Sequence, residues 1–281
     1  MLDKMELDIV KVNAKKGRKE KLIELFRQWK EAHGADSWFE KTCIKGKESD
    51  ENFKKSFIPD GCVDFEKYNN ANKKVLFILK EPASNGKEEE YNGISPISDL
   101  MKTHWYKLLV ENEGNIKFNN EKTNRSKCYY NKFKIICDML HVVPKETAFM
   151  NINKRGGYSK GTNDKMLSNY LEVYEDFVRK EIEILEPDVI VSCIGNGILK
   201  DKLYDENSIQ QIVATINNKK RDLFIAKYNK KTKVYGMYHP GCTLGYCNYK
   251  CLFENVIVGK KTEFEMIGVR QMFIASSFGF Q

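Results

Sequence analysis

Short runs of consecutive apolar residues recur along the chain, and each ends in Pro, Gly or a polar residue. Four runs have the length and the β-branched or aromatic content of buried strands: residues 73–82, 147–152, 188–195 and 233–239. A fifth run, at residues 222–228, is a weaker candidate. An unbroken apolar run, rather than a strict alternation, indicates a strand that helices cover on both faces.

Between these runs, apolar residues recur at three- and four-residue intervals. They predict helices over residues 97–112, 127–140 and 166–186, and an amphipathic helix over residues 17–33. Strands that alternate with helices imply right-handed crossovers. We therefore expect a three-layer α/β/α sandwich with a mainly parallel central sheet of four or five strands. This domain is expected to occupy residues 71–281, after an N-terminal helical extension in residues 1–70.

Charge and composition narrow the class of protein. The 281 residues include 47 Lys and Arg against 39 Asp and Glu, a net charge of +8 that favours a polyanionic partner. Basic runs occur at residues 15–21, 69–74 and 217–221. Such runs are also typical of an ordinary solvent-exposed surface. No apolar stretch is long enough to cross a membrane, and the eight cysteines are scattered, as in a reducing compartment. We expect a cytoplasmic monomer with no membrane partner.

Ligands of mainly parallel sheets bind beyond the carboxyl ends of the strands, so the residues that follow the predicted strands are the candidates for chemistry. Glu81 follows the first strand and can act as a base or orient a water, or it can simply be a surface carboxylate. Asn151 ends the second strand, where its amide suits the edge of a nucleobase, although Asn at this place often just forms a turn. Lys154 and Arg155 can hold phosphate or can be an ordinary basic turn.

His239 follows the last predicted strand and is one of four histidines in the chain. A single His at such a place is usually structural. The Pro and Gly that follow it set a tight turn, which would aim the imidazole over the edge of the sheet.

In this order, the strand ends resemble the motifs of the uracil-DNA glycosylase superfamily over about residues 73–258. LKEPA (79–83) resembles a first motif of the type Gly-Gln-Asp-Pro-Tyr, and MNINK (150–154) resembles the form Thr-Asn-x-x-Lys. EPDVIVSCIGNG (186–197) resembles Pro-x-x-Ile-x-x-x-Gly, and HPG (239–241) stands where the family has His-Pro-Ser. Two departures are Lys80 in place of Gln or Glu, and Glu81 in place of the commonest catalytic Asp.

The resemblance implies a monofunctional DNA glycosylase that flips out a nucleotide and cuts its N-glycosidic bond. Glu81 would position water and offset the charge on the sugar, His239 would donate a hydrogen bond to the leaving base, and Asn151 would read the base edge. Ala83 stands where a Tyr excludes substituents at C5, which favours a C5-modified pyrimidine over uracil.

The remaining site residues follow from the same resemblance. A ring from Trp105, or less favourably Tyr91, would stack on the flipped base, although Trp105 is equally suited to helix packing. Leu244, with Tyr246 as its substitute, would fill the gap in the duplex, unless Leu244 is simply buried. The DNA backbone would be held by Lys80, Lys154 and Arg155.

Two other classes of function remain open on the sequence. A catalytically silent nucleic-acid-binding protein would result if the ammonium of Lys80 occupied the carboxylate of Glu81. A nucleoside or nucleotide hydrolase would use the same groups on a small substrate. We expect no cofactor and no metal, because His239 and the nearby cysteines lack a CxxC pair, and because Arg155 stands where iron–sulfur relatives have a ligand Cys.

Overall fold

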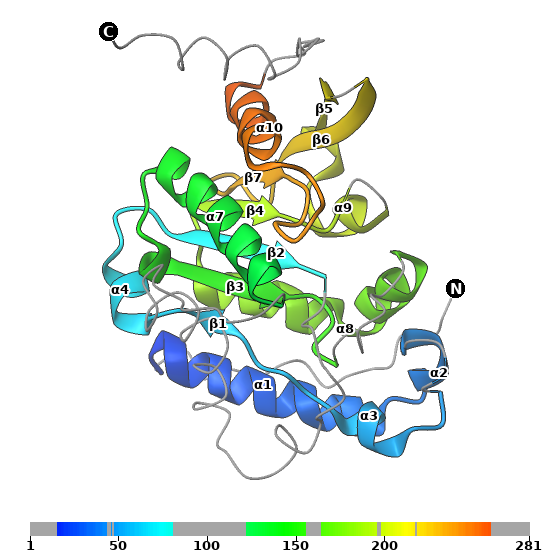
Figure 1. Ribbon diagram of the computed structural model, residues 1–281. Helices are drawn as coiled ribbons and strands as arrows, with labels where there is room; N and C mark the ends of the chain where they lie inside the picture. Colours follow the sequence, from blue (N-terminus) through cyan, green and yellow to red (C-terminus); the bar gives the residue numbers. More distant parts are fainter. Residues whose placement is uncertain are drawn as a thin grey trace, which may run out of the picture.

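A computed structural model describes residues 16–43, 46, 48–80, 122–155, 164–195, 198–216 and 218–259 of the chain. The fold is a mixed α/β fold with a seven-stranded sheet in the order β1-β3-β2-β4-β7-β6-β5 (Figure 1). The strands are β1 (Gly61–Cys62), β2 (Val75–Leu79), β3 (Thr147–Asn151), β4 (Val189–Ser192), β5 (Gln210–Ile216), β6 (Lys219–Lys227) and β7 (Lys233–Gly236). The α-helices are α1 (Arg18–Ala35), α2 (Phe39–Thr42), α3 (Glu51–Lys55), α4 (Phe65–Asn70), α7 (Lys122–Leu140), α8 (Asp164–Leu185), α9 (Ile198–Leu203) and α10 (Tyr246–Val258). Two 3-10 turns, η3 (Pro144–Glu146) and η4 (Glu206–Ser208), complete the described elements.

Strand β2 lies in the middle of the parallel part of the sheet, and all five of its residues are buried. It pairs in parallel with β3 on one side and with β4 on the other. Leu76 and Ile78 point into one hydrophobic cluster, and Phe77 points into the other. Both faces of β2 are therefore apolar, which explains why its sequence reads as an unbroken apolar run.

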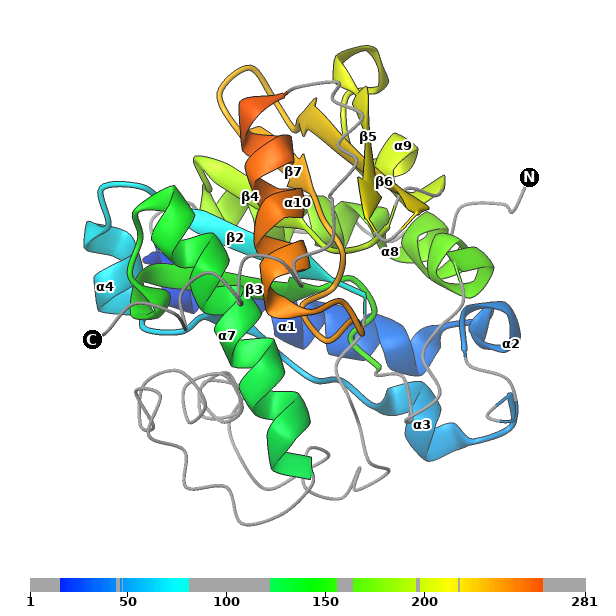
Figure 2. The ribbon, with the colours of Figure 1, turned by 45° about the horizontal axis from the view of Figure 1, so that its top comes forward.

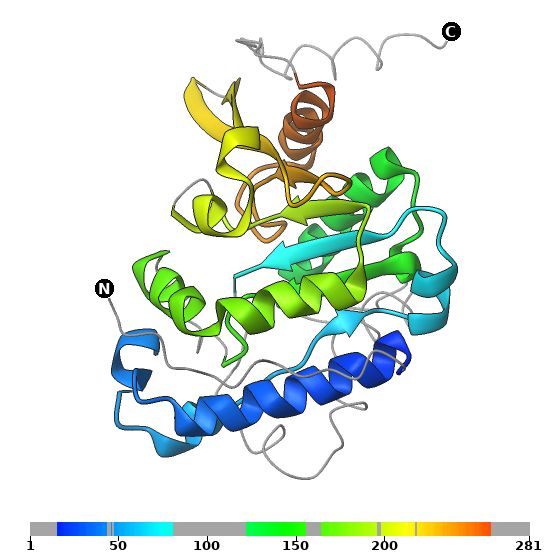
Figure 3. The ribbon, with the colours of Figure 1, turned by 180° about the vertical axis from the view of Figure 1, so that it is seen from behind.

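Helices cover each face of the sheet. On one face lie α1 and α8 (Figure 3). Their residues Phe26, Trp29 and Tyr174 belong to the same hydrophobic cluster as sheet residues. On the other face lie α7 and α10 (Figure 2). Their residues Phe133 and Leu252 belong to a second hydrophobic cluster shared with the sheet. Since α1 and β1 both precede residue 71, the first part of the chain contributes to the same core and the same sheet as the rest.

The four parallel strands are wound in two directions. Helix α7 precedes β3 on one face of the sheet, and α8 leads from β3 across β2 to β4 on the opposite face. The winding thus reverses between β2 and β4. In doubly wound sheets, ligands bind beyond the carboxyl ends of the strands at this point of reversal.

The predicted strands are confirmed as β2, β3, β4, β7 and β6, and three predicted helices are confirmed as α1, α7 and α8. The fourth predicted helix, residues 97–112, lies outside the described residues. The expectation of a mainly parallel sheet of four or five strands is wrong, because three of the six strand pairings are antiparallel. Strand β5 was missed since it lies at an edge and carries exposed polar residues, and β1 has only two residues.

None of the helices in the described part of the chain combines the length and apolar character needed to cross a membrane.

Candidate functional site

The carboxyl ends of the four parallel strands meet at one edge of the sheet. Lys80 follows β2, Asn151 ends β3, and His239 follows β7 after two intervening residues. The register places Leu79 opposite Asn151, and Ser192 opposite both Ile78 and Gly236. The sheet therefore brings the predicted Asn and His to the same edge, on either side of the point where the winding reverses.

The turn after β7 is fixed by its own hydrogen bonds. The N–H of Gly241 donates to Nδ1 of His239 at 3.0 Å, and the N–H of Cys242 donates to the His239 carbonyl at 2.9 Å. A Cβ on residue 241 would lie only 3.0 Å from that Nδ1, which explains the glycine at this position. From α7, Tyr129 meets the imidazole edge-on at 5.4 Å, and the buried Lys132 donates to the carbonyl oxygen of Cys242.

The imidazole of His239 is neutral at ordinary pH. The residue is exposed at the edge, but the protein around the ring desolvates it and, with the charges of Lys80 and Lys132, lowers its pKa to about 4. Because Nδ1 accepts the Gly241 hydrogen bond, the single ring proton must lie on Nε2. His239 therefore offers one N–H donor at the carboxyl edge of the sheet.

The amide of Asn151 is held in one orientation by Asp60. Its backbone N–H donates to Oδ2 of Asp60 at 2.6 Å, and its Nδ2 donates to the same oxygen at 3.0 Å. Since a carboxylate only accepts, the amide cannot be reversed. Oδ1 is left buried, without a hydrogen-bond partner among the residues that the structure describes. A buried, unsatisfied acceptor is uncommon in folded proteins.

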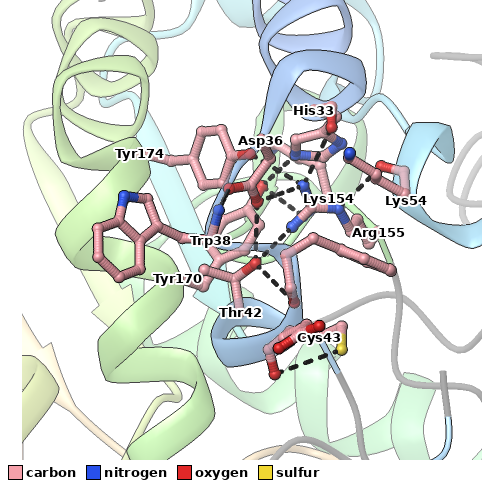
Figure 4. A network of polar contacts seen from close by, with 12 residues as sticks. His33, Asp36, Trp38, Thr42, Cys43, Lys54, Lys154, Arg155, Tyr170 and Tyr174 are labelled. Atoms are coloured by element: carbon pink, nitrogen blue, oxygen red, sulfur yellow. Dashed lines mark hydrogen bonds and ion pairs between the residues drawn. The ribbon is translucent and has the colours of Figure 1, made fainter. Parts of the chain in front are cut away.

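Lys154 and Arg155 are buried, so neither offers the exposed cation that the predicted contact with DNA phosphate would need, which corrects their predicted role. Both side chains are buried, between the end of β3 and helices α1 and α8 (Figure 4). Lys154 pairs with Asp60 and, at 2.8 Å, with Glu181. The physical reason is the packing of α1 over this turn, which encloses the two cations.

Arg155 uses its guanidinium on protein partners. It pairs with Asp36 at 2.8 Å and donates to the Tyr174 hydroxyl at 2.9 Å, the Thr42 hydroxyl at 3.1 Å and the Lys54 carbonyl at 3.0 Å (Figure 4). Through these partners, Arg155 ties the β3–α8 turn to the N-terminal segment and to α8.

The network around Lys154 also contains a perturbed carboxyl group. Burial raises the pKa of Glu181 well above its ordinary value, against the opposing effect of the Lys154 ammonium. A buried ammonium between two carboxyl groups is best balanced when one of them keeps its proton. Asp60 accepts the hydrogen bonds of Asn151 and also pairs with Lys154, so this network helps to hold Asn151 in place.

The other predicted site residues differ in exposure and in their contacts. Lys80 is partly exposed and pairs with Asp164 at the start of α8, at 2.7 Å. Tyr246 is exposed at the start of α10, while Leu244 is half-buried against the hydrophobic cluster of α7 and α10. Four predicted residues lie outside the described residues, namely Glu81, Ala83, Tyr91 and Trp105.

Two residues that shape the site were missed from the sequence. Asp60 lies in an irregular stretch with no motif, so only the tertiary structure reveals its pairing with Asn151 and Lys154. Lys132 did leave a signal, because it lies three residues after Tyr129 and four before Ile136, on the apolar face of a predicted helix. Within the described ranges, no three His, Cys, Asp or Glu side chains converge closely enough to hold a metal ion.

The described edge thus holds a neutral imidazole donor and a buried amide acceptor, with β2 and β4 between them. Such a pair suits a planar, uncharged ring that can both accept and donate hydrogen bonds. Comparison with models of known protein families, with curated proteins and with solved structures finds no match.

Proposed function

We propose that the protein is a DNA glycosylase that excises uracil or, as the favoured substrate, a C5-modified pyrimidine. The proposal is carried by the neutral N–H donor of His239 and the unpaired acceptor of Asn151 at one edge of the sheet. Strands β3 and β7 are three strand spacings apart, roughly 14 Å. This distance would be filled by the two side chains, the pyrimidine between them and one hydrogen bond on each side of the base.

The reaction breaks the N-glycosidic bond, and the bonding electrons go to the base nitrogen. A donor that faces the departing base stabilises the negative charge that develops on it, and a neutral imidazole does so without giving up its proton. The oxygen of a water forms the new bond to the sugar carbon. Glu81, which directly follows Lys80 at the end of β2, would orient this water, and the water's proton passes to the released base.

Base selection would rest on Asn151. Because Nδ2 is bonded to Asp60, Oδ1 is the atom left for the base, and it accepts an N–H from the pyrimidine edge. Both uracil-like and cytosine-like edges have such a donor. The sequence has Ala83 where the resembled family has a bulky ring, and a methyl side chain there would leave room at C5, which favours the C5-modified substrate.

The finer fold assignment is also part of this proposal. We assign the chain to a uracil-DNA glycosylase-like α/β/α sandwich, supported by the order of the strand-end motifs and by the helices on both faces. The alternative of a catalytically silent nucleic-acid-binding protein requires the ammonium of Lys80 to occupy the carboxylate of Glu81. The ion pair of Lys80 with Asp164 at 2.7 Å draws that ammonium toward α8 instead.

The decisive experiment measures base release from duplexes that carry uracil, 5-hydroxymethylcytosine, glycosylated 5-hydroxymethylcytosine or no altered base, scored as alkali-labile abasic sites. His239→Asn is the informative variant, because the Asn oxygen can accept the Gly241 N–H in an Asx turn while the Nε2 donor is lost. We expect release to fall on the order of a hundredfold or more. The matched control is His141→Asn, at the exposed end of α7 where φ is 57° and Asn is tolerated.

The pH profile gives an independent readout on the wild-type protein. Neutral His239 is the active form, so release falls as the pH drops through the lowered pKa of about 4, and it stays high around the ordinary His pKa of about 6.5. No release from any duplex would refute the enzymatic proposal. Strong release of uracil with none of the C5-substituted bases would leave a uracil enzyme and remove the preference for modified bases.

A further inference from the structure

The β5–β6 hairpin extends beyond the end of its neighbour β7. The last residue of β7, Gly236, pairs with Phe224, whereas β6 begins at Lys219, which pairs with Ile216 of β5. Five residues of β6, 219–223, therefore continue past β7, a distance of about 15 Å. Because β6 is antiparallel to β7, this tip projects from the same edge of the sheet as His239.

The tip carries three consecutive cations. Lys219 and Lys220 are exposed and Arg221 is half-buried, and no ion pair involves them in the part of the chain that the structure describes. Asp222 follows as a single acidic residue. The charge of the tip is therefore positive and available to a ligand.

Arg221 connects this tip to the site. Its guanidinium carbon lies 5.6 Å from the centre of the Tyr238 ring, and Tyr238 directly precedes His239. The Nε of Arg221 is buried without a hydrogen-bond partner among the described residues. Arg221 as a whole is only half-buried, so the charge of its guanidinium, packed on the Tyr238 ring, is still felt by an anion beside the tip.

Four other cations near the edge, among the residues that the structure describes, are buried or already have protein partners. Lys154 and Arg155 are buried, Lys132 donates to the carbonyl of Cys242, and Lys80 pairs with Asp164. The contacts to DNA phosphate that the sequence assigned to Lys154 and Arg155 must then come from elsewhere.

We propose that Lys219, Lys220 and Arg221 form a phosphate-binding hairpin that holds duplex DNA beside the His239 turn. This inference rests on the proposed function, since it takes DNA as the partner. The two exposed lysines supply charge that displaces counterions from the backbone, and Arg221 sits where the backbone next to an extruded nucleotide would pass. A basic two-stranded ribbon also fits the width of a duplex groove.

The test compares two pairs of lysines at opposite ends of β6. Lys219→Ala/Lys220→Ala changes the tip, and Lys230→Ala/Lys231→Ala removes equal charge from the exposed turn between β6 and β7 at the other end. Arg221 stays intact in both, because its contact with Tyr238 also supports the His239 turn. The probe is a fluorescently labelled duplex of unmodified DNA, titrated from about 50 mM to about 200 mM salt.

We expect the tip variant to lose affinity on the order of tenfold at low salt, and its log–log salt slope to become shallower by about two. The control pair should match the wild-type protein, with both variants showing the wild-type thermal transition. Unchanged affinity and salt slope in the tip variant would overturn the inference. If that variant alone then aggregated, the two lysines would serve to protect the sheet edge from aggregation instead. An equal loss of DNA affinity in both variants would also overturn the inference, because it would be an effect of net charge alone.

These outcomes are separate from a failure of the proposed function. Base release measured on the same proteins reports on the enzymatic proposal whether or not the tip holds the backbone. Wild-type protein that binds no duplex at any salt concentration would overturn the inference and remove DNA as the partner.

Discussion

At the scale of the residue, the most informative group is the amide of Asn151. One half of it is bonded to Asp60, and the other half is a buried oxygen without a partner among the described residues. Leaving such an acceptor unsatisfied costs about 1–3 kcal/mol. Groups that reduce stability in this way concentrate where a ligand uses them.

Replacing Asn151 by Ala tests whether this oxygen serves function or structure. The variant loses the hydrogen bond to Asp60 but also removes the unsatisfied acceptor, so we expect its free energy of unfolding to stay within about 1 kcal/mol of wild type. Base release should fall at least on the order of tenfold. Denaturant titration and the abasic-site assay measure the two effects.

Asn153→Ala is the matched comparison. The Oδ1 of Asn153 accepts the backbone N–H of Arg155 at 2.9 Å, so its loss leaves a buried donor unpaired and should cost about 1–3 kcal/mol. If Asn151→Ala instead destabilises as much as Asn153→Ala, and its activity follows the folded fraction, then Asn151 is a structural residue.

At the scale of the element, Lys154 joins three parts of the fold. It lies in the turn between β3 and α8, it pairs with Glu181 of α8, and its ammonium is 5.2 Å from the ring of Trp29 in α1. Asp60 completes the arrangement from the segment before β1. The network therefore fixes how α1 and α8 sit against the end of β3.

Lys154→Met should destabilise the protein by about 3–5 kcal/mol, because it leaves buried carboxyl groups without their cation. Adding Glu181→Gln removes one of these groups and should restore part of the loss. Lys165→Met, on an exposed position of α8, is the control and should change stability by less than about 0.5 kcal/mol. Thermal and denaturant unfolding provide the measurement. A loss under about 1 kcal/mol for Lys154→Met would mean that the ion pairs are dispensable.

At the scale of the whole molecule, α1 is part of the main core. Four of its side chains are fully buried in the cluster that also contains sheet residues: Leu22, Leu25, Phe26 and Trp29. Burying them contributes roughly 6–12 kcal/mol in total, at about 1.5–3 kcal/mol each. This is comparable with the entire net stability of a typical domain, about 5–15 kcal/mol.

A chain that begins at residue 37 should therefore lack a cooperative unfolding transition in calorimetry. Supplying residues 1–36 as a separate polypeptide should restore the transition at least in part, because the lost contacts are non-covalent. If the shortened chain melts at the wild-type temperature, α1 is a separable extension, as a boundary near residue 70 implies.

Across these scales, the local pattern of the sequence determined which segments form the main strands and helices. The apolar runs of β2, β3 and β4 and the periodic faces of α1 and α8 are properties of adjacent residues, and they predicted these elements close to their observed bounds. The strand-end rule also placed Asn151 and His239 at one edge of the sheet, since it needs only the parallel direction of the strands.

Only the tertiary structure decided where the charged side chains point. Lys154 and Arg155 looked like an exposed basic turn, and α1, more than a hundred residues earlier in the chain, encloses them. The antiparallel addition of β5 and β6 likewise depends on pairing with β7, and it moves Lys219 and Arg221 to the edge that carries His239. Burial and ion pairing are set by contacts between distant segments, which no local pattern encodes.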